Sequence, residues 1–108
     1  MPNGDDKNWI RLCGAIDGFR VRYDRWPTRI RINRMMFEDL RDHVLPRKAF
    51  AQLQRQLEFI VEDEMLMAAE DDTGAIYDYS REGFPESRPD PDARTWLGDP
   101  DLNLDLGY

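Results

Sequence analysis

Six arginines within fifteen residues form the most distinctive chemical group of this sequence. They are Arg20, Arg22, Arg25, Arg29, Arg31 and Arg34, with Tyr23 and Trp26 among them. Guanidinium groups bind phosphates and aromatic rings stack on bases, so the combination is typical of sequence-tolerant binding to single-stranded nucleic acid. The same side chains could instead pair with carboxylates of this chain or of a partner protein, or only solvate a strand. We favour carboxylate pairing and keep nucleic-acid binding as an alternative.

Two acidic clusters, at 62–64 and 70–72, offer the oxygen ligands that Mg²⁺ or Ca²⁺ prefers. Clustered acids are also common in solvated turns between strands, and the second cluster lacks the spacing of a calcium-binding loop. We therefore predict no metal site. These clusters contribute to an uneven charge distribution: residues 1–60 hold twelve basic and eight acidic side chains, and residues 61–108 hold three and fourteen. An acidic half of this kind could also imitate a phosphate backbone.

The sequence gives little support to catalysis. His43 is the single histidine, and near the end of a helix it is expected to interact with the helix dipole more often than to act as a base. Cys13 lies on an apolar helical stripe, which favours a buried thiol over a nucleophile. The chain contains no glycine-rich phosphate loop and no Gly-x-Ser-x-Gly or His-Glu-x-x-His motif. We expect neither an enzyme nor a cofactor.

The arginine segment overlaps the first two predicted elements. Apolar residues recur at three- and four-residue steps over 8–23, which predicts an amphipathic helix. Gly14 and Gly18 inside this helix indicate that another part of the chain packs very close to it. Residues 28–32 then alternate between apolar and polar, which predicts a strand with Arg29 and Arg31 on its polar face.

The rest of the pattern predicts two helices followed by three strands. Asn33 can cap a helix that ends before Pro46, and a second helix begins near residue 47. Strands are predicted at 58–62, 65–69 and 75–79, with a turn at 71–74 in which Gly74 tolerates a positive φ. We read these strands as a C-terminal antiparallel meander. The fold class is therefore α+β, a small two-layer domain of order α-β-α-α-β-β-β.

We place this domain at 1–80 and an irregular, acidic, proline-rich tail at 81–108. The tail has signals for a short helix near 91–97 and, beyond it, leucines that alternate with polar residues and could add a strand to a sheet edge. Trp26 is a candidate partner anchor, although a tryptophan packed over the core edge explains it as well. The candidate partner-binding residues are Trp26, Trp96, Leu97, Leu102, Leu104 and Leu106.

These features favour a non-catalytic protein-interaction or regulatory module whose partner is another protein. Nucleic-acid binding through the segment from Arg20 to Arg34 is one alternative, and an acidic nucleic-acid mimic or inhibitor is another. No apolar run approaches the ~20 residues of a membrane span, so we expect no membrane association. The polar, acidic N-terminus and the single cysteine favour a cytoplasmic location.

Overall fold

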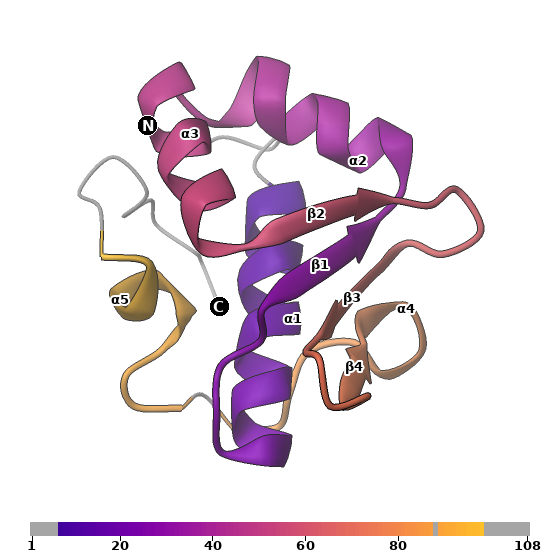
Figure 1. Ribbon diagram of the computed structural model, residues 1–108, viewed down its shortest axis with the longest axis vertical. Coiled ribbons are helices and arrows are strands. Elements are labelled where there is room, and N and C mark those ends of the chain that lie inside the picture. The colour runs from indigo at the N-terminus through magenta and orange to yellow at the C-terminus, as the bar shows by residue number, and fades with distance from the viewer. Residues whose placement is uncertain (1–6, 88, 99–108) are drawn as a thin grey trace.

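Four short strands form a single sheet beside a long N-terminal helix in the computed structural model, which describes residues 7–87 and 89–98 (Figure 1). In chain order the elements are α1 (Lys7–Tyr23), β1 (Arg29–Ile32), α2 (Arg34–Asp39), the π-helical segment η2 (Leu40–Val44), α3 (Arg47–Gln56), β2 (Glu58–Val61), β3 (Met67–Glu70), β4 (Ile76–Asp78), α4 (Tyr79–Glu82) and α5 (Ala93–Leu97). The α+β class is confirmed, and so is the predicted order up to β4. The short helix α4 was not predicted.

One part of the predicted topology is corrected. The sheet order is β2-β1-β3-β4, with β1 parallel to β2 and antiparallel to β3. Only β3 and β4 pair as the meander requires, because β1 lies between β2 and β3. Residues 62–66 cross two inter-strand spacings of about 4.8 Å each, a distance within the reach of five residues. The central position of β1 fully buries Ile30 and Ile32.

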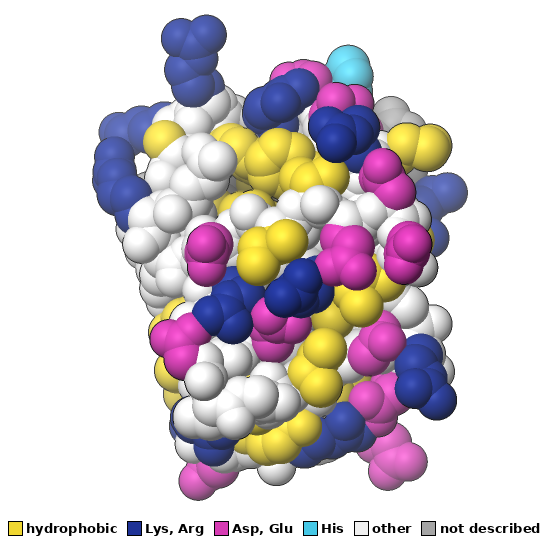
Figure 2. Space-filling model, turned by 45° about the vertical axis from the view of Figure 1, so that its right-hand side comes forward, with side chains coloured by type: hydrophobic (Ala, Val, Ile, Leu, Met, Phe, Trp, Pro, Cys, Tyr) yellow, Lys and Arg dark blue, Asp and Glu magenta, His cyan; other side chains and the backbone are white. Residues whose placement is uncertain are grey.

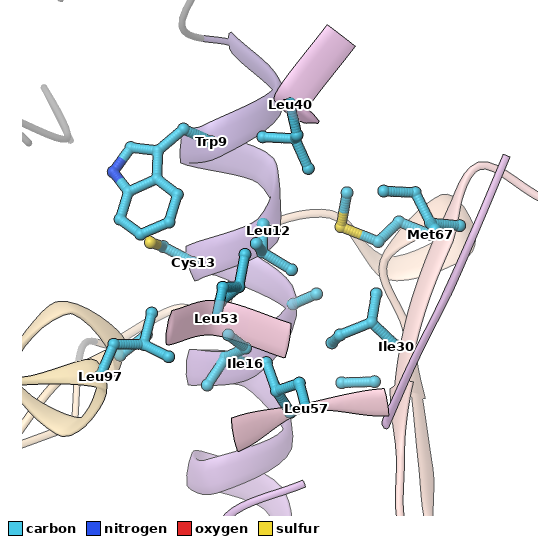
Figure 3. Close-up of a cluster of buried hydrophobic side chains, with 14 of the residues drawn as sticks. Trp9, Leu12, Cys13, Ile16, Ile30, Leu40, Leu53, Leu57, Met67 and Leu97 are labelled. Carbon is cyan, nitrogen blue, oxygen red and sulfur yellow. The ribbon is translucent and has the colours of Figure 1, made fainter. Parts of the chain in front are cut away.

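Helix α1 is buried along most of its length. Its buried residues are Trp9 and all those from Leu12 to Phe19. Figure 3 shows that α1 lies between the strands and α5, and that side chains reach it from the sheet, from α3 and from α5: Ile30, Met67, Leu53, Leu57 and Leu97. Burial of this apolar surface, at roughly 25 cal/mol per Å², is the main stabilising contribution to the domain.

The two glycines of α1 make room for aromatic rings. A Cβ atom at Gly18 would lie 2.3 Å from the ring of Tyr77, and one at Gly14 would lie 2.5 Å from the ring of Phe84. Tyr77 comes from β4 and Phe84 follows α4, so the C-terminal part of the sheet packs directly on the backbone of α1. The close approach predicted from the glycine spacing is confirmed.

Asp17 joins α5 to the middle of α1. Its Oδ1 accepts a hydrogen bond from the main-chain N–H of Ala93 at 2.6 Å, and both residues are fully buried. Ala93 begins α5, where an N–H has no acceptor within the helix. Asp92 caps the same helix by accepting from the N–H of Thr95, and Gly98 ends it with a φ of 75°. Leu97 then adds its side chain to the core.

No helix in the described ranges has both the length and the apolar composition that a membrane crossing requires.

Candidate interaction site

The two faces of the sheet differ because β1 alternates. Ile30 and Ile32 point into the core, whereas Arg29 and Arg31 lie on the opposite, outer face. The register places Glu70 of β3 beside Arg29, and it places Glu58 and Ile60 of β2 beside the two arginines. Figure 2 shows Lys and Arg side chains lying among Asp, Glu and hydrophobic side chains on this side of the molecule. The outer face is therefore a mixed charged surface rather than a basic one.

Both arginines of β1 contact several carboxylates. Arg31 donates from Nε to Glu70 Oε2 and from Nη1 to Glu62 Oε2, each at 2.9 Å. Arg29 donates from Nη1 to Glu70 Oε1 at 3.3 Å, from Nε to Glu58 Oε1 at 3.5 Å and from Nη2 to Asp72. The bonds to Glu70 and Glu62 raise the pKa of Arg31. Within this outer-face cluster two guanidinium groups meet four carboxylates, so negative charge is in excess.

Arg25 binds the turn between β3 and β4. Its Nε donates to Asp71 Oδ2 at 2.7 Å, and its Nη2 donates to Thr73 Oγ1 at 2.9 Å. Asp71 Oδ1 also accepts from the N–H and the hydroxyl of Thr73, and Gly74 has a φ of 92°. The Thr73 hydroxyl, followed by Arg25, lowers the pKa of Asp71 to about 2. The predicted turn with a positive φ at Gly74 is confirmed.

The other three candidate arginines lie outside this cluster. Arg22 pairs with both carboxylate oxygens of Glu82, which raises the pKa of Arg22 and lowers that of Glu82. The guanidinium of Arg20 lies 3.6 Å from Asp24 and 5.0 Å from the ring centroid of Trp26. Arg34 is exposed, and within the described residues its guanidinium has no ion-pair partner. The six arginines therefore do not form one continuous basic surface.

The predicted aromatic anchors contact each other. The rings of Trp26 and Trp96 are stacked, with centroids 4.7 Å apart and planes 5° apart, and both side chains are partly buried. Leu97 is 2% exposed and belongs to the core. Residues 102–106, with the candidates Leu102, Leu104 and Leu106, lie outside the described residues. The pair of tryptophans thus connects the loop before β1 to α5.

One edge of the sheet is closed by a side chain. The hydroxyl of Tyr23 donates to the carbonyl oxygen of Ile76 at 2.8 Å and accepts from the N–H of the same residue at 3.3 Å. Ile76 belongs to β4, the last strand in the sheet order of the described residues. Tyr23 therefore occupies main-chain groups that a further strand on β4 would need.

The opposite edge, at β2, has no further strand beside it among the described residues. The N–H groups of Glu58 and Glu62 donate to β1 and its flanking residue, at Thr28 O (3.1 Å) and Ile32 O (2.8 Å). Main-chain groups alternate in direction along a strand, so those of Phe59 and Val61 point away from β1. No residue in the described ranges bonds to these groups. We call the outward N–H and C=O groups of Phe59 and Val61 the open edge.

A hollow of mixed polar and apolar lining lies near Phe59 of β2. Phe37, Leu45 and Phe50 line a groove of about 750 Å³ together with the polar side chains of Arg41, Asp42, Arg47 and Gln54. The ring of Phe59 lies 5.6 Å from that of Phe37 and 6.1 Å from that of Phe50. Phe59 thus connects β2 to this hollow, which we call the aromatic groove.

Two further hollows are less suited to binding an added strand. One of about 640 Å³, beside His43, mixes basic and acidic side chains, and there Asn8 donates to Asp39 at 2.7 Å. Another of about 410 Å³ is lined by Val21, Tyr77 and Phe84. Neither adjoins an unpaired main-chain edge. Within the described ranges no group of three or more His, Cys, Asp or Glu side chains is arranged to hold a metal ion.

The sequence did not reveal the open edge or the closure by Tyr23, because both depend on which strands lie at the ends of the sheet. Comparison with protein-family models, with curated proteins and with solved structures found no match to this chain.

Proposed function

We propose that this protein is a non-catalytic interaction module that binds an extended segment of a partner protein along the open edge of β2. The observation that carries this proposal is the difference between the two sheet edges. At β4 the hydroxyl of Tyr23 bonds to both main-chain groups of Ile76, whereas at β2 the outward groups of Phe59 and Val61 have no partner among the described residues.

The surroundings of β2 supply the two requirements of strand addition. In this binding mode main-chain hydrogen bonds provide affinity, and pockets for alternate side chains provide specificity. The open edge offers the hydrogen bonds. The aromatic groove lies on the side of Phe59, where every second side chain of an added strand would point.

The alternative of nucleic-acid binding has less support. Five of the six candidate guanidinium groups contact a carboxylate of the same chain. A phosphate would have to displace these carboxylates, and binding would lose part of the gain that comes from releasing counterions. The alternative of an acidic mimic stays a prediction, as does the cytoplasmic location.

The test compares two substitutions at one position of the open edge. Val61→Pro removes the outward N–H of Val61, which has no hydrogen-bond partner among the described residues. An edge strand tolerates proline at a position whose N–H points away from the sheet. Val61→Thr keeps the N–H and a similar shape. Peptides selected from a random display library on the wild-type protein should bind Val61→Thr nearly unchanged and Val61→Pro at least about tenfold more weakly.

Calorimetry on the selected peptides gives the affinities, and far-UV circular dichroism checks that both variants are folded. Selection of no peptide by the wild type, or equal binding to the two variants, would show that the open edge is not the binding site.

A further inference from the structure

The charges around β2 indicate which kind of strand fits there, an inference that rests on the proposed function. Glu58, Ile60 and Glu62 follow one another at two-residue spacing on the outer side of β2. The side chain of Glu58 is 66% exposed and reaches Arg29 only at 3.5 Å. That of Glu62 is 38% exposed. Both carboxylates therefore remain accessible to a neighbour beyond the open edge.

Within the described residues, the basic side chains that contact these carboxylates do not balance their charge. Arg29 and Arg31 contact Glu58, Glu62, Glu70 and Asp72, which leaves an excess of two negative charges in the cluster. The acidic residues Asp63 and Glu64 follow directly, and the whole chain has a formal net charge of −7. A basic segment is thus attracted both by the local carboxylates and by the overall field.

The other side of an added strand would meet a different surface. Phe59 and Val61 share the core side of β2 with Ile30 and Ile32. The ring of Phe59 contacts Phe37 and Phe50, which line the aromatic groove. A side chain on this side that lies against these rings gains from burial of apolar surface, which favours apolar residues next to Phe59.

We propose that the partner segment is an amphipathic strand of another protein, with basic residues four positions apart facing Glu58 and Glu62 and apolar residues between them facing the aromatic groove. The spacing is the same for either strand direction, because Glu58 and Glu62 lie symmetrically about Ile60. A second copy fits less well. Antiparallel pairing of two β2 strands centred on Ile60 would bring Glu58 of each copy opposite Glu62 of the other, and like charges in such pairs repel.

Three end-capped probe peptides test this proposal: Gly-Lys-Phe-Thr-Val-Lys-Gly, the same sequence with both Lys replaced by Gln, and the same sequence with both Lys replaced by Glu. Fluorescence anisotropy measures their binding to the full-length protein. The Lys peptide should bind at least roughly fivefold more tightly than the Gln peptide, and the Glu peptide should bind more weakly than either. Raising NaCl from about 30 mM to about 300 mM should reduce this difference, because exposed pairs are screened.

Two double variants separate the local charges from the overall field. Glu58→Gln with Glu62→Gln should make the Lys and Gln peptides bind equally. Glu38→Gln with Glu86→Gln removes the same charge from exposed positions elsewhere and should preserve most of the preference. Equal losses in both double variants would show that only the net charge matters and would overturn the proposed pairing.

The remaining outcomes distinguish this inference from the proposed function. If the three peptides bind equally and Val61→Pro abolishes all binding, strand addition stands and the charge preference is wrong. If none of them binds, the partner chemistry is wrong, and the display selection decides separately whether the edge accepts any strand. A dimer of the wild type in light scattering that Val61→Pro dissociates would identify a second copy as the occupant and overturn the proposal.

Discussion

Gly14 and Gly18 have the same role but different neighbours. The ring over Gly18 belongs to Tyr77, which is 5% exposed and donates its hydroxyl to Gly83 O at 2.7 Å. The ring over Gly14 belongs to Phe84, which is 43% exposed. A methyl group at either position would overlap a ring, but the ring of Phe84 is far more exposed than that of Tyr77 and is therefore easier to displace.

Gly18→Ala should therefore lower the free energy of unfolding by about 1–2 kcal/mol, the cost of overpacking less the gain in helix propensity. Gly14→Ala should change it by less than about 1 kcal/mol, because displacement of the Phe84 ring and the gain in propensity nearly cancel. Urea unfolding followed by tryptophan fluorescence measures both values. Equal destabilisation by the two substitutions would contradict this account.

At the scale of elements, α5 depends on a buried carboxylate of another helix. The segment around α5 is short, and a helix of five residues has little stability of its own. Its position is determined by the bond from Ala93 to Asp17, by the burial of Leu97 and by the stacking of Trp96 on Trp26. Gln56 of α3 adds a bond to the carbonyl oxygen of Trp96 at 3.0 Å.

Asp17→Ala should weaken the docking of α5 by about 1–3 kcal/mol, because the N–H of Ala93 would stay buried without this acceptor. Asp17→Asn keeps an oxygen at the same position and should cost less. Hydrogen exchange followed by NMR should show faster exchange at Ala93 in Asp17→Ala, whereas the amides of β1 should change less. Unaltered exchange at Ala93 would show that the bond does not hold α5.

Local signals predicted the elements, but not how they pair. The alternation over 28–32 identified β1 and its outward arginines, and Asn33 does cap α2 by accepting from the N–H of Met36 at 2.8 Å. The acidic residues 62–64 have the polar composition of a turn, and the two strands that they connect do run antiparallel. Nothing local to them indicates that β1 lies between those strands. For the same reason, the local sequence does not indicate that β2 lies at an edge of the sheet.

At the scale of the whole molecule, the two unlike halves of the sequence are brought together by folding. Ion pairs join Arg22 to Glu82 and Arg25 to Asp71 across more than forty residues. On the face that Figure 2 shows, the charges that are segregated along the chain are thus mixed. Cys13 is buried in the core, as its place on the apolar stripe predicts, and His43 lies on an exposed turn of η2.

The stability of the protein should fall in acid because these carboxylates are paired. The pKa of Asp71 is about 2 in the folded protein and near its ordinary value, about 4, in the unfolded chain. The lowered value contributes stability that is fully present above about pH 5 and is lost as the pH falls from about 4 to about 2. Glu82, whose pKa is also lowered, adds to the same trend.

Urea unfolding at a series of pH values should therefore show a difference between wild type and Asp71→Asn that is greatest near neutral pH and shrinks below about pH 4. Thr73→Val, which removes the hydroxyl that donates to Asp71, should reduce the pH dependence in the same window. A difference that stays constant down to about pH 2 would show that the carboxylate of Asp71 is not stabilised by its charge.

In the proposed binding mode, the hydroxyl of Tyr23 also limits how many molecules can assemble through this sheet. A sheet with two free edges can be extended from both, and copies of such a protein can polymerise into fibres. In the described residues the main-chain groups of Ile76 on β4 are already bonded to Tyr23, so the proposed mode adds a strand at β2 and not at Ile76. A complex formed in this way would contain one added strand per domain. The phenol oxygen of Tyr23 would then end the growth of the sheet on the side of β4.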